Sequence, residues 1–202
     1  MSYRFLLHTV LFLVLVGLTA CAPMRVRQNP QSLAMQTARE SSLGAMSHWK
    51  LTAHIGVSDG HDGGSGQLVW RQDGDRFSFV VHAPVTGRTW KLAGDKTRAV
   101  LEGVDPQPDF DGNAQRLLKQ RLGWDVPLDE LVDWVRGMRA ANQQATLVFD
   151  ARDLPAVLVQ NGWKVEYRAW FAEHDPPLPR KVFASKGQAH VRMVIENWSL
   201  DD

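Results

Sequence analysis

The chain has 202 residues, one cysteine and a formal net charge of +1, from 23 Lys and Arg against 22 Asp and Glu. Arg4 is the only formally charged residue among the first twenty, so the rest of the chain is formally neutral. A neutral body lacks the basic surplus that nucleic-acid binding requires, and it argues against electrostatic adhesion to anionic lipid as the main membrane anchor.

The N-terminus has the pattern of an export signal. Arg4 precedes an apolar run over residues 5–16, and small residues lead up to Cys21. This run of about a dozen residues is shorter than the roughly 20 that a membrane-spanning helix needs. Leu18-Thr19-Ala20-Cys21 resembles a bacterial lipobox, in which the cysteine sulfur receives a diacylglycerol and the signal is cut just before it. We therefore expect residues 1–20 to be a signal peptide and Cys21 to be lipidated. An ordinary export signal with an accidental cysteine is the alternative.

The next segments change from a tether to a helix and then to strands. Residues 21–30 contain two prolines and no hydrophobic periodicity, which predicts a tether. Apolar residues at helical spacing predict an amphipathic helix over residues 31–46. From Trp49 the period changes to two, which predicts a half-buried strand over residues 49–57. The glycine-rich residues 58–66 predict a loop, and further strands of an antiparallel meander are predicted at residues 66–72, 76–83, 89–93 and 99–104.

Two helices interrupt the strands. Leucines at helical spacing predict a helix over residues 109–123, with Asp111 capping its start and Gly123 its end. A second helix is predicted between Pro127 and Gly137. Strands resume at residues 145–150, 157–160, 162–171, 180–185 and 189–198, and the alternation in the third of these places Trp163 and Phe171 on one face and Trp170 on the other.

About ten strands in one small domain must curl or close into a barrel. The inserted helices must bury their apolar stripes, and the concave face of a curled sheet is the obvious place for them. The space between helices and sheet is then either packed solid or left as a cavity of the size of a lipid tail.

The residues offer no convincing catalytic constellation. Ser65 lies between glycines, near His61 and Asp62. A hydrolase nucleophile elbow needs a strand before the serine and a helix after it, whereas this segment joins two predicted strands. The histidines lack metal-binding spacing, and no glycine-rich phosphate motif is present. We expect no enzyme activity, no metal and no cofactor.

Tryptophan is the unusual residue type, with eight in the chain and most of them on predicted strands. Large rigid rings either fill a core or line a wide apolar cavity without collapsing into it. The sequence pattern does not separate these two uses.

Several blocks of the sequence resemble the LolB family of outer-membrane lipoproteins. The two most specific blocks are WDVPLDELVDWVRG at residues 124–137 and Gln160-Asn-Gly-Trp163. The others are Trp49-Lys-Leu-Thr-Ala53, Gly66-Gln-Leu-Val-Trp70, Phe77-Ser-Phe-Val-Val-His-Ala-Pro84, Lys164-Val-Glu-Tyr167, Leu178-Pro179 and Val194-Ile-Glu-Asn-Trp198. Together they extend over nearly the whole chain after Cys21.

The resemblance implies a mainly β fold over residues 31–202: an incomplete antiparallel β-barrel of about ten or eleven strands, with a helical lid over a hydrophobic cavity. It implies a monomeric outer-membrane lipoprotein facing the periplasm. Such a protein accepts acylated lipoproteins from a LolA-type periplasmic carrier and inserts them into outer-membrane lipid. Ala22 after Cys21 also indicates the outer membrane, because Asp there would resemble an inner-membrane retention signal.

The resemblance also implies site residues. In the family an exposed apolar residue in a loop assists delivery into the bilayer, and Val85 in the turn Pro84-Val85-Thr86-Gly87 occupies that position, with Val in place of Leu and one extra residue before the glycine. The candidates for the acyl-binding cavity are Trp49, Leu51, Ile55, Leu68, Trp70, Phe77, Phe79, Trp90, Leu117, Leu118, Leu131, Trp134 and Trp163.

Two other functions stay open at this point. One is a scaffold lipoprotein that binds a protein partner and has a filled core. The other is an envelope hydrolase, for which the sequence shows no nucleophile and base pair.

Overall fold

The computed structural model describes residues 29–200, so the predicted signal peptide, Cys21 and most of the tether lie outside the described residues. The elements are α2 (Pro30–Ala45), β1 (His48–Ser58), β2 (Gly63–Asp73), β3 (Arg76–Ala83), β4 (Arg88–Gly94), β5 (Ala99–Glu102), β6 (Asp109–Asp111), α3 (Ala114–Leu122), α4 (Leu128–Trp134), β7 (Ala145–Phe149), β8 (Pro155–Gln160), β9 (Trp163–Phe171), β10 (Leu178–Lys186) and β11 (Ala189–Leu200).

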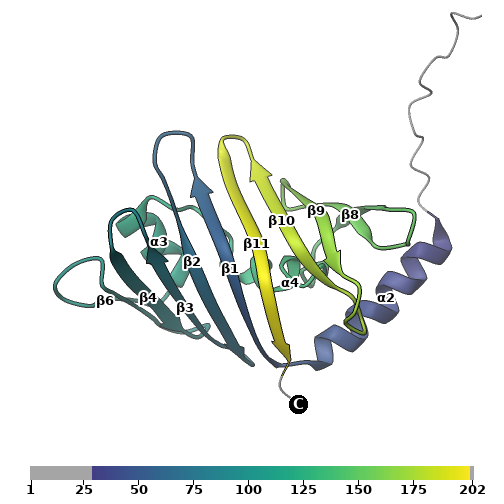
Figure 1. Cartoon of the computed structure of the whole chain (residues 1–202), viewed down its shortest axis with the longest axis horizontal. Helices are drawn as coiled ribbons and strands as arrows, with labels where there is room; N and C mark the ends of the chain where they lie inside the picture. The colour runs from purple at the N-terminus through teal and green to yellow at the C-terminus, as the bar shows by residue number, and fades with distance from the viewer. Residues whose placement is uncertain (1–28, 201–202) are drawn as a thin grey trace, which may run out of the picture.

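The strands form one antiparallel sheet of eleven strands, in the order β6-β5-β4-β3-β2-β1-β11-β10-β9-β8-β7. Figure 1 shows the strands side by side, with α2 along one flank. Each hairpin pairs neighbours in sequence, and β1 meets β11 at the centre. Because β6 and β7 are the two ends of this order, the sheet stays open, which confirms the predicted incomplete barrel.

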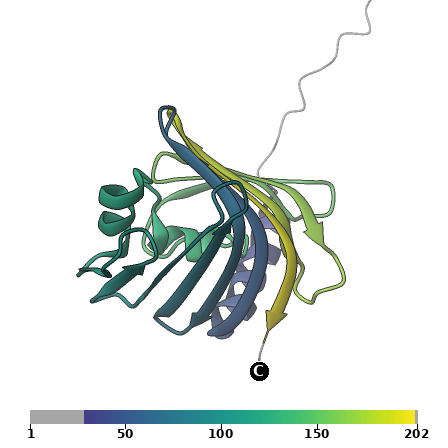
Figure 2. The same ribbon diagram turned by 60° about the vertical axis from the view of Figure 1, so that its left-hand side comes forward.

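The sheet is curved, and α3 and α4 lie on its concave side (Figure 2). Alternation along the strands sets which side chains reach that side. Leu51, for example, lies opposite Trp70 on one neighbour and opposite Trp198 on the other, and all three are buried. The apolar members of each strand therefore share the concave face, and the intervening residues form the solvated convex face.

The helices begin and end at the residues that cap them. Asn29 caps α2, since its side chain accepts a hydrogen bond from the Gln31 N–H. Asn113 caps α3 in the same way through the Arg116 N–H, so the prediction of Asp111 as the cap was wrong. Gly123 ends α3 in the left-handed conformation at φ 73°, which confirms the predicted end and explains the need for glycine.

Three further predictions about local structure were wrong. Residues 109–111 form the edge strand β6 rather than the first turn of a helix. Residues 63–66 belong to β2 rather than to a loop, so Ser65 pairs with Gly56 inside the ladder. A β-bulge between β9 and β10 shifts the register after Tyr167, and this shift turns Trp170 into the core.

Candidate functional site

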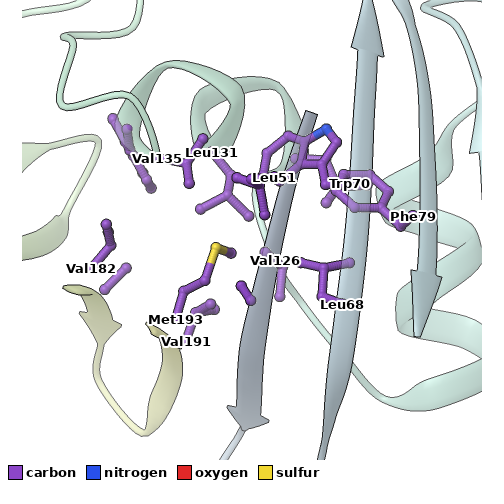
Figure 3. Close-up of a cluster of buried hydrophobic side chains, with 14 of the residues drawn as sticks. Leu51, Leu68, Trp70, Phe79, Val126, Leu131, Val135, Val182, Val191 and Met193 are labelled. Carbon is purple, nitrogen blue, oxygen red and sulfur yellow. The ribbon is translucent and has the colours of Figure 1, made fainter. Parts of the chain in front are cut away.

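The concave side of the sheet encloses a small apolar cavity beneath α3 and α4, which we call the hollow. Figure 3 shows Leu131 and Val135 of the α4 segment facing side chains of β1–β3, β10 and β11. All the side chains that line the hollow are apolar: Ile55, Val57, Leu68, Phe79, Val81, Trp90, Leu92, Leu118, Trp124, Val126, Leu128, Leu131, Val191 and Met193. The hollow thus lies between the sheet and the helices, where the sequence places a cavity or a solid core.

The hollow is narrow in this conformation. Its volume is about 30 Å³, room for one or two water molecules at most. A fatty acyl chain does not fit into this volume. Any larger apolar guest requires the helices to move away from the sheet.

Only some of the residues predicted to form the cavity line the hollow. Ile55, Leu68, Phe79, Trp90, Leu118 and Leu131 line it. The other candidates are buried in the solid core around it, apart from the half-buried Phe77, which packs on Phe79: Trp49, Leu51, Trp70, Leu117, Trp134 and Trp163. Sequence reasoning missed the remaining lining residues, of which Trp124 is the largest.

Residues 113–134, which comprise α3, the link 123–127 and α4, cover the hollow and are called the lid. Trp124 in the link closes it against the sheet. Its ring meets the edge of Trp90 with the ring centroids 5.4 Å apart. On β2 the ring rests on Gly64, where a Cβ atom would come within 2.9 Å of Trp124 Cζ2. Gly64 therefore leaves the space that Trp124 occupies.

Gly64→Ala is expected to loosen the lid, because the added methyl group and the Trp124 ring cannot keep their present positions. Hydrogen exchange should speed up over residues 113–131 while the strands stay protected. Gly56→Ala is the matched control, since Gly56 lies on the neighbouring strand and a Cβ there meets nothing within 4 Å. Equal exchange in the two variants would show that Trp124 does not hold the lid closed.

The C-terminal end of the lid is anchored by buried hydrogen bonds. Gln160, which is 1% exposed, accepts from the Trp134 indole N–H at 3.0 Å and from the Ala140 N–H at 2.9 Å. Its amide group donates to the Ala140 carbonyl at 2.8 Å. The Tyr167 hydroxyl donates to the Trp134 carbonyl at 3.0 Å, and burial raises the pKa of this hydroxyl above its usual range, so it stays protonated. These contacts fix α4 to β8 and β9.

Helix α2 adds a second set of anchors. Arg39 donates to the carbonyl oxygens of Arg136 and Gly137, at 2.6 and 2.8 Å, and to that of Pro177. Burial lowers the pKa of Arg39 to about 10, so the guanidinium still carries its charge at neutral pH. Arg136 in turn donates to the Leu43 carbonyl at 2.9 Å. The face of α2 that packs on the domain is therefore largely polar. This polar face explains why apolar residues recur only weakly at helical spacing in α2.

The N-terminal end of the lid is held differently. Ion pairs tie the exposed side chains Arg116 and Arg121 of α3 to Asp111 and Asp109 of β6. Lys119 pairs with Asp125 at 2.7 Å within the lid itself. Surface ion pairs of this kind contribute about 0–1 kcal/mol each. The α4 end of the lid is thus held by buried hydrogen bonds, whereas the α3 end is held by surface ion pairs and by the buried side chains of Leu117 and Leu118.

Val85 does not line the hollow and lies in the β3–β4 turn. Its side chain is 95% exposed, the largest exposed fraction among the big apolar residues of the described chain. Gly87 adopts φ 66° and closes the turn. The turn with its extra residue therefore presents an isolated apolar side chain to solvent.

Two histidines of β1 lie on the surface and pair with carboxylates. His54 pairs with Glu196 at 2.9 Å, and His48 pairs with Asp73 at 2.7 Å, all of them exposed. Within residues 29–200 no group of three or more His, Cys, Asp or Glu side chains is placed to bind a metal ion. None of the helices that the structure describes is both long and apolar enough to cross a membrane.

Comparison with known proteins places the chain in a family. Residues 47–198 match the family model described as outer membrane lipoprotein LolB. The outer-membrane lipoprotein LolB of Xanthomonas campestris pv. campestris (strain 8004) is 36% identical over 93% of this chain and 94% of its own length. That of Xylella fastidiosa (strain Temecula1) is 31% identical over 90% of this chain and 84% of its own length.

A structure search finds the same fold in a more distant protein. The LolA superfamily protein NE2245 from Nitrosomonas europaea aligns with a TM-score of 0.52 at 10% identity, over 85% of this chain and 94% of its own. An identity this low supports the fold alone. The family model matches most of the chain, and the relatives named above are more than 30% identical to it. This chain therefore belongs to the LolB family of outer-membrane lipoproteins.

Proposed function

We propose that this protein accepts the acyl chains of other lipoproteins from a LolA-type periplasmic carrier and releases them into the outer membrane. Lipid on Cys21 anchors it to that membrane, facing the periplasm, and it acts as a monomer. The observation that carries the proposal is the wholly apolar lining of the hollow, under a lid whose buried hydrogen bonds are confined to its α4 end among the described residues. Family membership supports the same role.

Transfer energetics require such a chaperone. A buried methylene contributes about 0.8 kcal/mol, so the tails of a triacylated lipoprotein, with roughly 45 methylenes, would cost on the order of 35 kcal/mol to expose to water. Acyl chains therefore pass between apolar sites without entering the periplasm. The sequence has no glycine-rich nucleotide-binding motif. In this proposal transfer therefore runs down a gradient of affinity, from the carrier to this protein and then to the bilayer.

The unequal attachment of the lid supplies a route for loading. Acyl chains enter when α3 breaks its surface ion pairs with β6 and residues 113–131 swing away from the sheet. The anchors of Trp134 and Arg136 stay in place and act as the pivot. Displacing Trp124 from Gly64 joins the hollow to solvent, and the apolar lining then receives the tails.

A mixing experiment tests the function. Acylated cargo bound to purified LolA is mixed with this domain, and the cargo is followed by affinity capture of each protein. The cargo should move to this domain and then into added liposomes. Cargo that stays on LolA at equilibrium contradicts the proposal.

Val85→Glu should leave uptake of cargo from the carrier nearly unchanged and impair release into liposomes. Val85 lies outside the hollow, so its substitution does not alter the acyl site. A carboxylate at the exposed tip disfavours insertion of the turn into a bilayer. Val159→Glu is the control, since Val159 is also exposed but lies on β8. Normal release by the Val85 variant would remove this residue from the mechanism.

A scaffold lipoprotein with a filled core is the second candidate function. The observation in its favour is the small volume of the hollow, about 30 Å³. Fluorescent acyl probes separate the two candidates: a filled core takes up no probe, whereas a lid that opens gives saturable uptake.

A further inference from the structure

The convex face of the sheet concentrates positive charge on its central strands. None of the described helices covers β2, β1, β11 and β10 on this side (Figure 2). Cross-strand pairing places Lys50 beside Arg71, and Arg192 beside Phe183, on this face. Lys181 of β10 pairs with Val194 of β11, and Val194 pairs with His54 on the convex side of β1. Lys181 therefore lies on the convex face as well. The basic face, as we call Lys50, Arg71, Lys181 and Arg192, spans four adjacent strands.

The cations of the basic face lack acidic partners among the described residues. Some other cations of the convex face are paired: Lys91 with Glu102 at 3.5 Å, and both Lys164 and Arg168 with Glu166. Arg76 of β3, like the basic face, makes no ion pair within residues 29–200. Lys50, Arg71, Lys181 and Arg192 make no ion pair with any residue in the range 29–200. No direct ion pair among the described residues neutralises them, and the two carboxylates on the same four strands, Asp73 and Glu196, pair with His48 and His54 instead.

This arrangement is unfavourable for the isolated fold. Lys50 and Arg71 are directly opposite each other in the ladder, and like charges in such a pair destabilise a sheet. The ring of Phe183 lies under Arg168 at 4.4 Å and near Arg192 at 5.9 Å. These cation–π contacts hold guanidinium groups over the sheet rather than in free solution. The Lys50–Arg71 pair therefore has no stabilising role within the fold, and an anionic partner would offset its repulsion.

The opposite side of the molecule carries the balancing charge. Over residues 105–134, which include the lid, the acidic residues outnumber Arg116, Lys119 and Arg121: they are Asp105, Asp109, Asp111, Asp125, Asp129, Glu130 and Asp133. The formally neutral composition thus conceals a polarised molecule, negative over β6, its flanking loop and the lid taken together, and positive on the convex face. Such a molecule orients itself in the field of a charged surface.

We propose that the basic face binds the anionic phospholipid headgroups of the membrane to which the chain is anchored. This rests on the proposed anchoring of Cys21. Seven residues separate Cys21 from Asn29, so an extended tether keeps the domain within roughly 30 Å of the bilayer. A curved sheet touches a plane along its central strands, and those strands carry the basic face. Docked in this way, the lid faces away from the membrane, toward an incoming carrier.

Vesicle sedimentation tests the proposal without cargo or carrier, so a failure of the acyl-transfer function would not affect its outcome. The domain of residues 22–202, without lipid on Cys21, is suitable because its hydrophobic core lies within the described residues. It is mixed with vesicles of phosphatidylethanolamine, with or without phosphatidylglycerol. Binding should require phosphatidylglycerol and weaken as salt is added.

Neutralising the basic face should remove this binding. Each cation near an anionic surface contributes about 1 kcal/mol, so the combined change Lys50→Gln, Arg71→Gln, Lys181→Gln and Arg192→Gln should weaken binding about a thousandfold. The control removes as many charges elsewhere, through Lys96→Gln, Arg98→Gln, Lys119→Gln and Arg152→Gln, and should bind nearly as the unaltered domain does.

Three results would overturn the proposal. The first is that the unaltered domain does not bind phosphatidylglycerol vesicles. The second is that both variants lose binding equally. The third is that the basic-face variant binds vesicles normally but accepts cargo slowly from LolA. The last result would assign the basic face to the carrier instead of the membrane.

Discussion

Val81→Glu should reduce the affinity of the domain for acyl chains by at least a hundredfold. Val81 is 2% exposed and lines the hollow from β3. Bound acyl chains would have to bury the new carboxylate, and removing a carboxylate from water without a partner costs several kcal/mol. Each ~1.4 kcal/mol of lost binding energy is a factor of ten in affinity. Titration with a fluorescent fatty acid measures the loss.

Val80→Glu provides a matched control for this experiment. Val80 precedes Val81 on the same strand, pairs with Lys91 and lies on the convex face. The same substitution there leaves the hollow unchanged, so probe binding should stay within a few-fold of that of the unaltered domain. Far-UV circular dichroism checks that both variants keep the sheet. Equal probe binding by the two variants would place the acyl site outside the hollow.

Gln160→Leu should lower the free energy of unfolding by about 3–5 kcal/mol, the largest effect on stability that we expect from a single side chain. The substitution leaves the Trp134 indole N–H and both backbone groups of Ala140 buried without their partner. Each such group costs about 1–3 kcal/mol, offset in part by the apolar leucine. Urea denaturation followed by circular dichroism measures the change.

Gln67→Leu is the control for that substitution, because Gln67 is exposed on the convex face of β2. Its effect should stay within about 0.5 kcal/mol. A loss at Gln160 no larger than this would mean that the α4 end of the lid is not anchored there, and the proposed pivot would have to move.

Hydrophobic alternation predicted most of the sheet, and β3 was predicted with the same ends that the structure shows. The errors came where a local pattern had two interpretations. Asp109–Asp111 has the composition of a helix start, yet it pairs with β5. The bulge that turns Trp170 inward depends on the backbone pairing of β9 with β10, which side-chain periodicity does not record.

The candidate site was harder to predict than the fold. Alternation identifies the face of a strand on which a side chain lies, but not its position along the sheet relative to the lid. Trp49 and Trp70 share the concave face with Phe79, yet they pack on each other with ring centroids 4.9 Å apart, in the solid part of the core. Arg39 and Gln160 were missed because their partners are backbone groups brought near by the fold.

The basic face shows the same limit. Its residues come from two hairpins, β1–β2 and β10–β11, that are far apart in the sequence, and the overall composition is close to neutral. The register of β1 on β2 places Lys50 opposite Arg71. The register of β10 on β11 places Lys181 and Arg192 two positions apart on the same face. Charge polarity of this kind follows from topology rather than from composition.

Photo-crosslinking of cargo tests the central claim most directly. A lipoprotein whose acyl chains carry a photoreactive group is transferred to the domain, irradiated, and mapped by mass spectrometry. We predict adducts on side chains that line the hollow, such as Val81, Leu118 and Met193. Transfer that proceeds with adducts confined to the convex face or to the Val85 turn would contradict the account.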